Sequence, residues 1–274
     1  MEAIPVKVVP RGFGETKRQD SWWVEPLVVF LVLGGFIVYA TWAAFQNAHY
    51  TFGPYLSPFY SPVIFASPGD AAGLEHAWFG EWPSWIPAMI PFSPALLILP
   101  FPGLFRFTCY YYRGAYYKAF WADPISCAVG EPRGTHYLGE RWFPLVLQNV
   151  HRYFLYVAVI FIALLSYDVY LATQWATADG GREFGVGLGT LILAVNVVLI
   201  AGYTFGCHAM RHIVGGKFDE VTKKGAACEF AYSCSSGLNY KHQLFAYLSM
   251  FSVVSSDVYV RLCSMGIIND VRFF

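Results

Sequence analysis

The chain has 274 residues, of which 56% are hydrophobic and only 13% are charged. Soluble domains carry about 25% charged residues, so this composition excludes an ordinary water-soluble protein and favours one that folds in lipid. Eighteen Lys and Arg residues balance eighteen Asp and Glu residues. The zero net charge excludes a basic nucleic-acid-binding protein and an acidic disordered tail. We therefore expect an all-α membrane protein.

Five apolar stretches follow one another along the chain, each long enough for the roughly 20 residues that a transmembrane helix needs. We expect a cytoplasmic segment at 1–22 and a single transmembrane domain, a five-helix bundle, over 23–274. The helices are predicted at about 24–45, 91–120, 143–175, 184–212 and 240–263. The second is rich in proline and is expected to kink near Pro100, because proline has no N–H to donate within a helix.

Lys and Arg are distributed unevenly over the loops and the helix ends next to them. Thirteen lie in residues 1–22, 113–144 and 211–241, whereas three lie in the segments that alternate with them along the chain. Short loops rich in Lys and Arg face the cytoplasm. We therefore expect the N-terminus inside the cell and the C-terminus outside.

The second and fourth predicted helices end in the same pattern. Cys109-Tyr-Tyr-Tyr-Arg113 and Cys207-His-Ala-Met-Arg211 both read C-x-x-x-R, and each is followed by a basic–aromatic pair and a further cysteine. This match indicates an internal repeat.

The third and fifth predicted helices match each other in the same way. His151 and His242 each open an H-x-x-F-x-Y pattern, and Asp168 and Asp257 each open a D-V-Y pattern one helix length later. Two matched helix pairs indicate a duplicated helical hairpin.

The expected topology brings four repeat-matched side chains to a similar depth near the cytoplasmic face: Cys109, His151, Cys207 and His242. Two thiolates and two imidazoles are the ligand set of a Rieske-type [2Fe–2S] cluster, and helical bundles build cofactor sites from facing helices. We therefore predict such a cluster here. Haem b held by His151 and His242 and a zinc ion on the same four ligands are alternatives. A purely structural interpretation also stands, because buried cysteine packs as a small apolar residue.

Other thiols and imidazoles on the cytoplasmic side are alternative ligands: Cys127, Cys228, Cys234, His208 and His212. Five of the six cysteines fall on that side, where disulfides are rare, which favours metal ligation or reduced thiols. Charged residues inside the bilayer are functional candidates by default, and five are expected there: Arg106, Arg152, Asp168, Asp257 and Arg261. The two Asp residues have two possible roles: a structural hydrogen bond to a neighbouring helix, or proton relay.

Four stretches carry a family resemblance: Phe105–Arg113, Phe143–Phe154, Cys207–His212 and Asp257–Gly266. They resemble the single-chain membrane anchors of actinobacterial succinate dehydrogenases, over roughly residues 20–270. The resemblance implies a five-helix subunit of the cell inner (plasma) membrane. It also implies that the subunit docks a flavoprotein and an iron–sulfur protein and passes their electrons to a quinone such as menaquinone. Better-known anchors of this enzyme class bind haem, but the repeat-matched cysteines here favour the Rieske-type cluster.

Such a subunit has no dehydrogenase chemistry of its own, since the sequence has no nucleotide-binding loop, no catalytic nucleophile arrangement and no large soluble domain. The role leaves the oligomeric state and the direction of the reaction open. A quinone site needs aromatic residues and a few hydrogen-bond donors near the cluster. By position, the candidates are Tyr110, Arg113, Trp121, Arg152, His208 and Arg211. The alternative from another class is a small secondary transporter, because repeats, a proline-broken helix and intramembrane charges are transporter features.

Overall fold

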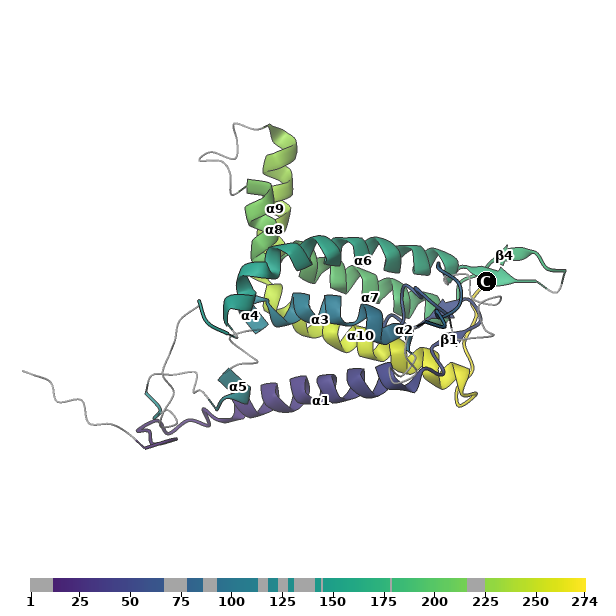
Figure 1. Cartoon of the computed structure of the whole chain (residues 1–274). Coiled ribbons are helices and arrows are strands. Elements are labelled where there is room, and N and C mark those ends of the chain that lie inside the picture. Colours follow the sequence, from purple (N-terminus) through teal and green to yellow (C-terminus); the bar gives the residue numbers. More distant parts are fainter. Residues whose placement is uncertain are drawn as a thin grey trace, which may run out of the picture. The chain divides into compact units, whose positions relative to one another are not determined.

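The computed structural model describes residues 12–66, 78–85, 93–112, 118–122, 128–130, 141–143, 145–177, 179–215 and 225–274, and most of them are helical (Figure 1). The chain forms two compact units. One consists of Met1–Ile37 and Phe107–Asn149, and the other of Val38–Arg106 and Val150–Phe274.

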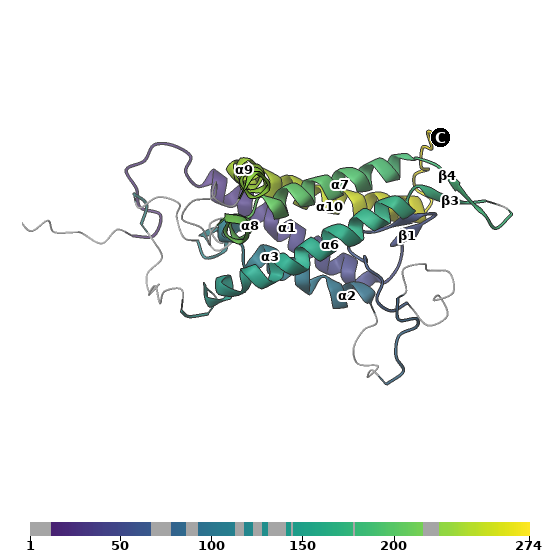
Figure 2. The same ribbon diagram turned by 90° about the horizontal axis from the view of Figure 1, so that it is seen from above.

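Three long helices form the second unit's bundle: α6 (His151–Leu171), α7 (Leu188–Phe205) and α10 (His242–Ser264). They run side by side in both Figure 1 and Figure 2. The buried positions of α6 recur every three or four residues, from His151 through Leu155 to Asp168, which is the spacing of one helical face. One face of α6 is therefore buried against neighbouring elements, and this face contains both His151 and Asp168.

Three helices of the described residues are long and apolar enough to cross a membrane: α1 (Val24–Gln46), α6 and α7. The chain is therefore a membrane protein, as its composition indicates. Helix α10 is as long as α1 but more polar, because it contains five serines besides Asp257 and Arg261.

The prediction of one continuous helix over the proline-rich stretch 91–120 is wrong. It contains α2 (Pro94–Ile98), α3 (Pro100–Phe107) and the single turns α4 (Tyr110–Tyr112) and α5 (Lys118–Phe120), while residues 91–92 and 113–117 lie outside the described part. The expected break near Pro100 is confirmed, because α2 ends at Ile98 and α3 begins at Pro100. Proline cannot donate the backbone hydrogen bond that would join the two helices into one.

The third and fourth helices are shorter than predicted. A 3-10 segment, Leu145–Val150, precedes α6, and the residues after α6 form strand β3 (Gln174–Ala176), which pairs antiparallel with β4 (Arg182–Phe184). Helix α7 starts at Leu188 rather than 184 and ends at Phe205 rather than 212. The chain restarts as α8 (His208–Gly215) after Gly206 and Cys207.

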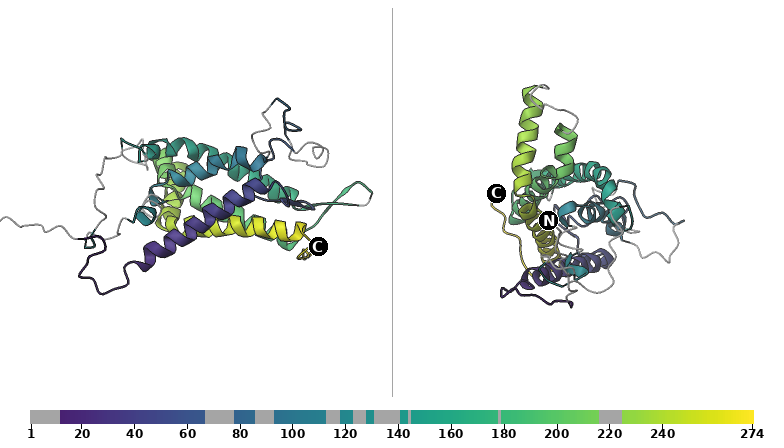
Figure 3. Two further views of the ribbon diagram at one scale, coloured as in Figure 1. Left: turned by 60° about the horizontal axis from the view of Figure 1, so that its bottom comes forward. Right: turned by 90° about the vertical axis from the view of Figure 1, so that its left-hand side faces the viewer.

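The segment predicted as the cytoplasmic loop 211–241 is largely helical. Helix α9 (Ala226–Tyr240) follows α8, and the two helices stand off from the bundle together (Figures 1 and 3). Ser235 Oγ donates to the Phe205 carbonyl at 2.8 Å and Asn239 Nδ2 to the Gly206 carbonyl at 2.7 Å, so α9 satisfies carbonyls that the end of α7 leaves without helical partners. Its Ser- and Gly-containing sequence is a poor helix former and lacks a long apolar run, which explains why it was missed.

A short hairpin of β1 (Thr51–Phe52) and β2 (Tyr55–Leu56) lies at the opposite end of the bundle from α8 and α9, near the C-terminus (Figure 1). Tyr55 packs there in a buried cluster with Leu193 of α7, Val260 of α10 and Ala172, the residue that follows α6. Gly189 lets α7 approach this ring, since a Cβ at that position would lie 2.5 Å from a Tyr55 ring carbon.

Hydrogen bonds and a ring contact join the two chain segments of the first unit. Gly14 N donates to the Gly130 carbonyl and Gly130 N to the Glu15 carbonyl, both at 2.9 Å. The Phe30 ring on α1 packs against Phe120 with 4.8 Å between centroids.

Candidate cofactor site

His151 and Cys207 contact each other inside the second unit. His151 is the first residue of α6, and Cys207 follows the last residue of α7 by two positions. The two helices are antiparallel, so the start of one lies beside the end of the other. The His151 Nε2 and Cys207 Sγ atoms are 3.0 Å apart, and both side chains are buried.

A chain of stacked rings joins His151 to His242, the first residue of α10. The Phe105 ring is stacked on the His151 imidazole with 4.8 Å between centroids and meets Tyr203 edge-on at 5.5 Å. Tyr203 is in turn stacked on His242 at 4.8 Å. Both repeat-matched histidines are therefore buried at the same end of the bundle and held by aromatic contacts.

Arg106 supplies the positive charge of this cluster. Its guanidinium carbon lies 4.7 Å from the Tyr203 ring centroid, within cation–π range. The same guanidinium donates to the Ala246 carbonyl at 3.1 Å and to Ser249 Oγ at 2.9 Å. Arg106 thus ties α3 to α10 beside His242.

The donor atoms fit a [2Fe–2S] cluster in kind, because a thiol and two imidazoles are buried together away from water. Within the described residues, however, no three His, Cys, Asp or Glu side chains come close enough to hold a metal ion. Direct contact between His151 and Cys207 means that ligation requires these two side chains to separate. The fourth predicted ligand, Cys109, belongs to the first unit, where it follows α3 by two residues.

The six predicted quinone contacts are divided between the two units, and one of them lies outside the described residues. Arg152 and His208 are exposed in the second unit, and Arg211 binds α9 through Tyr232 Oη at 3.0 Å and Asn239 Oδ1 at 3.3 Å. Tyr110 and Trp121 belong to the first unit and are exposed, and Arg113 lies outside the described residues. Partial desolvation lowers the pKa of the His208 imidazole, and the nearby His212 and Arg211 lower it further.

Sequence reasoning missed the two rings between the histidines, although the repeat contains them. Phe105-x-Phe-x-Cys109 and Tyr203-x-Phe-x-Cys207 share an aromatic residue four positions before the cysteine. Four residues are about one helical turn, so the ring and the cysteine lie on one side of the helix end. Extending the repeat by one turn would have found both rings.

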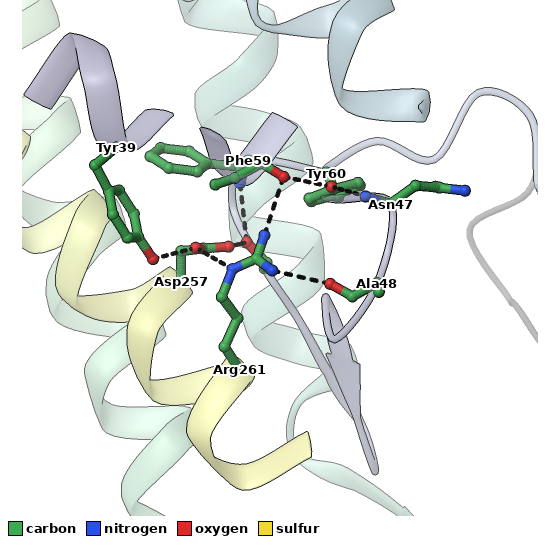
Figure 4. Close-up of polar contacts among 9 residues, drawn as sticks. Tyr39, Asn47, Ala48, Phe59, Tyr60, Asp257 and Arg261 are labelled. Atoms are coloured by element: carbon green, nitrogen blue, oxygen red, sulfur yellow. Dashed lines mark hydrogen bonds and ion pairs between the residues drawn. The ribbon is translucent and has the colours of Figure 1, made fainter. Parts of the chain in front are cut away.

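A second buried polar network lies towards the other end of the bundle (Figure 4). Asp257 and Arg261, one turn apart on α10, form an ion pair with 2.7 Å between Oδ2 and Nε, and both are almost fully buried. Tyr39 Oη on α1 donates to Asp257 at 2.6 Å, and Ser57 Oγ donates to its other carboxylate oxygen. Arg261 also donates to the Ala48 and Ala43 carbonyls at 2.9 and 3.1 Å.

Asp168, the repeat partner of Asp257, accepts a hydrogen bond from Ser61 Oγ. Both acids therefore bind serines of one connecting segment, Ser57 and Ser61, and Asp257 also binds the neighbouring helix α1. The predicted hydrogen bond to a neighbouring helix is confirmed for Asp257, whereas Ser61, which donates to Asp168, lies in the connecting segment. Proton relay through either acid stays a prediction.

Comparison with known proteins identifies this architecture. Residues 24–266 match the family model of the actinobacterial succinate dehydrogenase subunit SdhC. A chain of the Mycobacterium smegmatis Sdh1 complex in the apo form is similar, with a TM-score of 0.82, 42% sequence identity and coverage of 94% of each chain. No curated protein matches the sequence. The chain belongs to the actinobacterial succinate dehydrogenase subunit SdhC family.

Proposed function

We propose that this chain is the membrane anchor of a succinate:quinone oxidoreductase in the cell inner (plasma) membrane. In this role it binds the flavoprotein and iron–sulfur subunits and delivers their electrons to a quinone such as menaquinone. The family supports membership of a succinate dehydrogenase and leaves no support for the transporter alternative. The similar chain belongs to an Sdh complex, which supports partners of this kind.

The proposed topology has five transmembrane helices, an inner N-terminus and an outer C-terminus. The distribution of Lys and Arg supports it. In this orientation the end of the bundle with His151, Cys207 and His242 faces the cytoplasm, together with α8 and α9. The outer end contains Asp257, Arg261 and the β hairpins. Electrons from a cytoplasmic partner then reach the buried histidines without crossing the whole bilayer.

The proposed cofactor is a Rieske-type [2Fe–2S] cluster held by Cys109, His151, Cys207 and His242. The observation that carries this proposal is the buried contact between His151 and Cys207 beside the ring stack that leads to His242. When bound, such a cluster supplies one-electron transfer. The chain's own residues exclude water from the ligands and orient the imidazoles, through Phe105 on His151 and Tyr203 on His242. Arg106 holds a positive charge next to them.

The quinone is proposed to bind near these ligands. Arg152 and His208 are the candidates in the second unit with exposed side chains, each adjacent in sequence to a proposed ligand. An arginine and an imidazole can both donate hydrogen bonds to a quinone carbonyl. Arg211, a further candidate, also donates hydrogen bonds to Asn239 and Tyr232 of α9 and so positions the α8–α9 pair.

Electron paramagnetic resonance of the dithionite-reduced, detergent-purified complex tests the cofactor. We expect a Rieske-like signal, on top of those of the partner clusters, that disappears in Cys207→Ser and His242→Ala. Cys234→Ser is the matched control, because this cysteine is exposed on α9 and should leave the signal unchanged. A reduced haem absorption band that depends on His151 and His242 would instead support bis-His haem b. A signal that survives Cys207→Ser would refute this ligand.

A further inference from the structure

Two histidines outside the proposed cofactor cluster lie together on α8. The sequence His208-Ala-Met-Arg-His212 places their imidazoles four residues apart, and residues at this spacing are neighbours on one helix face. Both side chains are exposed. Their Nε2 atoms are 3.0 Å apart, and the ring planes meet at 78°. The pair is therefore already assembled and accessible.

The spacing of the two nitrogens suits a metal ion. Zinc binds histidine nitrogen at about 2.0–2.1 Å in tetrahedral geometry, which places two nitrogen ligands about 3.3 Å apart. The observed 3.0 Å differs from this by about 0.3 Å, an adjustment that small side-chain rotations supply. Two histidines four residues apart on a helix are also the zinc-binding arrangement of the H-E-x-x-H motif, in which both lie on one face.

Without a metal, one ring can donate its Nε2–H to Nε2 of the other, since 3.0 Å is also a normal N–H···N distance. A metal ion needs the lone pair on both Nε2 atoms. The hydrogen between the rings must then move to Nδ1 of its own ring, which converts one tautomer to the other without net loss of a proton. Binding is therefore compatible with neutral imidazoles.

The positively charged side chain nearest to the pair in sequence, Arg211, binds α9 rather than the two histidines. Arg211 lies between the two histidines in sequence, but its guanidinium binds Tyr232 and Asn239 of α9 and lies 5.3 Å from the Tyr232 ring centroid. Across the described residues, no third His, Cys, Asp or Glu joins the pair in a metal-binding group. A cation held by these two histidines would complete its coordination with other ligands such as water.

We propose that His208 and His212 form a binding site for a divalent transition-metal cation such as Zn²⁺, separate from the proposed iron–sulfur ligands. Imidazole is a suitable ligand for zinc, nickel and copper, whereas Mg²⁺ and Ca²⁺ prefer oxygen. The site lies on the helix that directly follows Cys207, so a bound cation occupies the surface next to the proposed electron path.

Zinc titration of the purified, chelator-treated complex tests the proposal, with free Zn²⁺ followed by a competing colorimetric indicator. We expect one binding event per anchor chain that is weakened at least tenfold in His208→Ala and equally in His212→Ala. His49→Ala is the control, because this exposed imidazole has Ser264 rather than a second histidine as its neighbour, and it should leave binding unchanged. Succinate oxidation with an artificial acceptor checks that each variant complex is assembled.

Three outcomes overturn the proposal. They are absence of the binding event in the unmodified complex, wild-type affinity in either single variant, and the same loss in the His49→Ala control. A double variant that binds no more weakly than each single variant supports the pair acting as one site, because either histidine alone provides only one ligand. None of these results depends on whether the iron–sulfur cluster is present.

Discussion

Removal of one partner from the buried Asp257–Arg261 ion pair should destabilise the bundle strongly. Asp257→Ala deletes the carboxylate that accepts hydrogen bonds from Tyr39, Ser57 and Arg261 and leaves the guanidinium buried. Breaking a buried ion pair in this way costs about 3–5 kcal/mol. The Ala43 and Ala48 carbonyls still accept hydrogen bonds from Arg261, so we expect the lower end of this range. A loss of about 3 kcal/mol lowers the unfolding midpoint by about 6–12 °C in a chain of this size.

Thermal unfolding of the purified complex measures this shift, with Arg261→Met and the double variant completing a double-mutant cycle. We expect the double variant to lose less than the sum of the two single losses, because it leaves no unpaired buried charge. Glu183→Ala breaks the exposed ion pair with Arg272 and is the control, expected to cost under about 1 kcal/mol. Single losses that add without coupling, or a midpoint shift in Asp257→Ala no larger than in this control, would contradict a large penalty for an unpaired buried charge.

Two further substitutions test the packing of α7. Gly189→Ala places a Cβ 2.5 Å from the Tyr55 ring and should cost about 1–3 kcal/mol through overpacking; a midpoint equal to that of the parent would contradict the close approach. Asn196 is buried, and neither amide atom has a hydrogen-bond partner among the described residues, which costs about 1–3 kcal/mol. Asn196→Leu should therefore leave the unfolding midpoint unchanged or raise it. A clear fall in the midpoint would mean that this amide has a hydrogen-bond partner in the assembled complex.

Several features of the molecule were predictable from the sequence because they depend on local physical chemistry. The apolar stretches, and the break at Pro100, follow from the cost of exposing polar groups to lipid and from the missing N–H of proline. The repeat-matched histidines were correctly assigned to helix starts, since His151 and His242 are the first residues of α6 and α10. The resemblance in the quoted motifs is confirmed by the SdhC family match.

Contacts between distant segments were decided only by the tertiary structure. Helix α9 has no apolar run long enough to identify it, and its Ser235 and Asn239 side chains donate hydrogen bonds to carbonyls at the end of α7. The carboxylate of Asp257 gained its partners only when residues more than 190 positions away, Ser57 and Tyr39, were brought to it. By itself, the sequence indicated a helical membrane protein and where the candidate ligands lie along the helices, because both depend on composition and spacing within one segment. Which rings separate the two histidines, and which side chains neutralise each buried charge, depends on packing between segments that no local pattern describes.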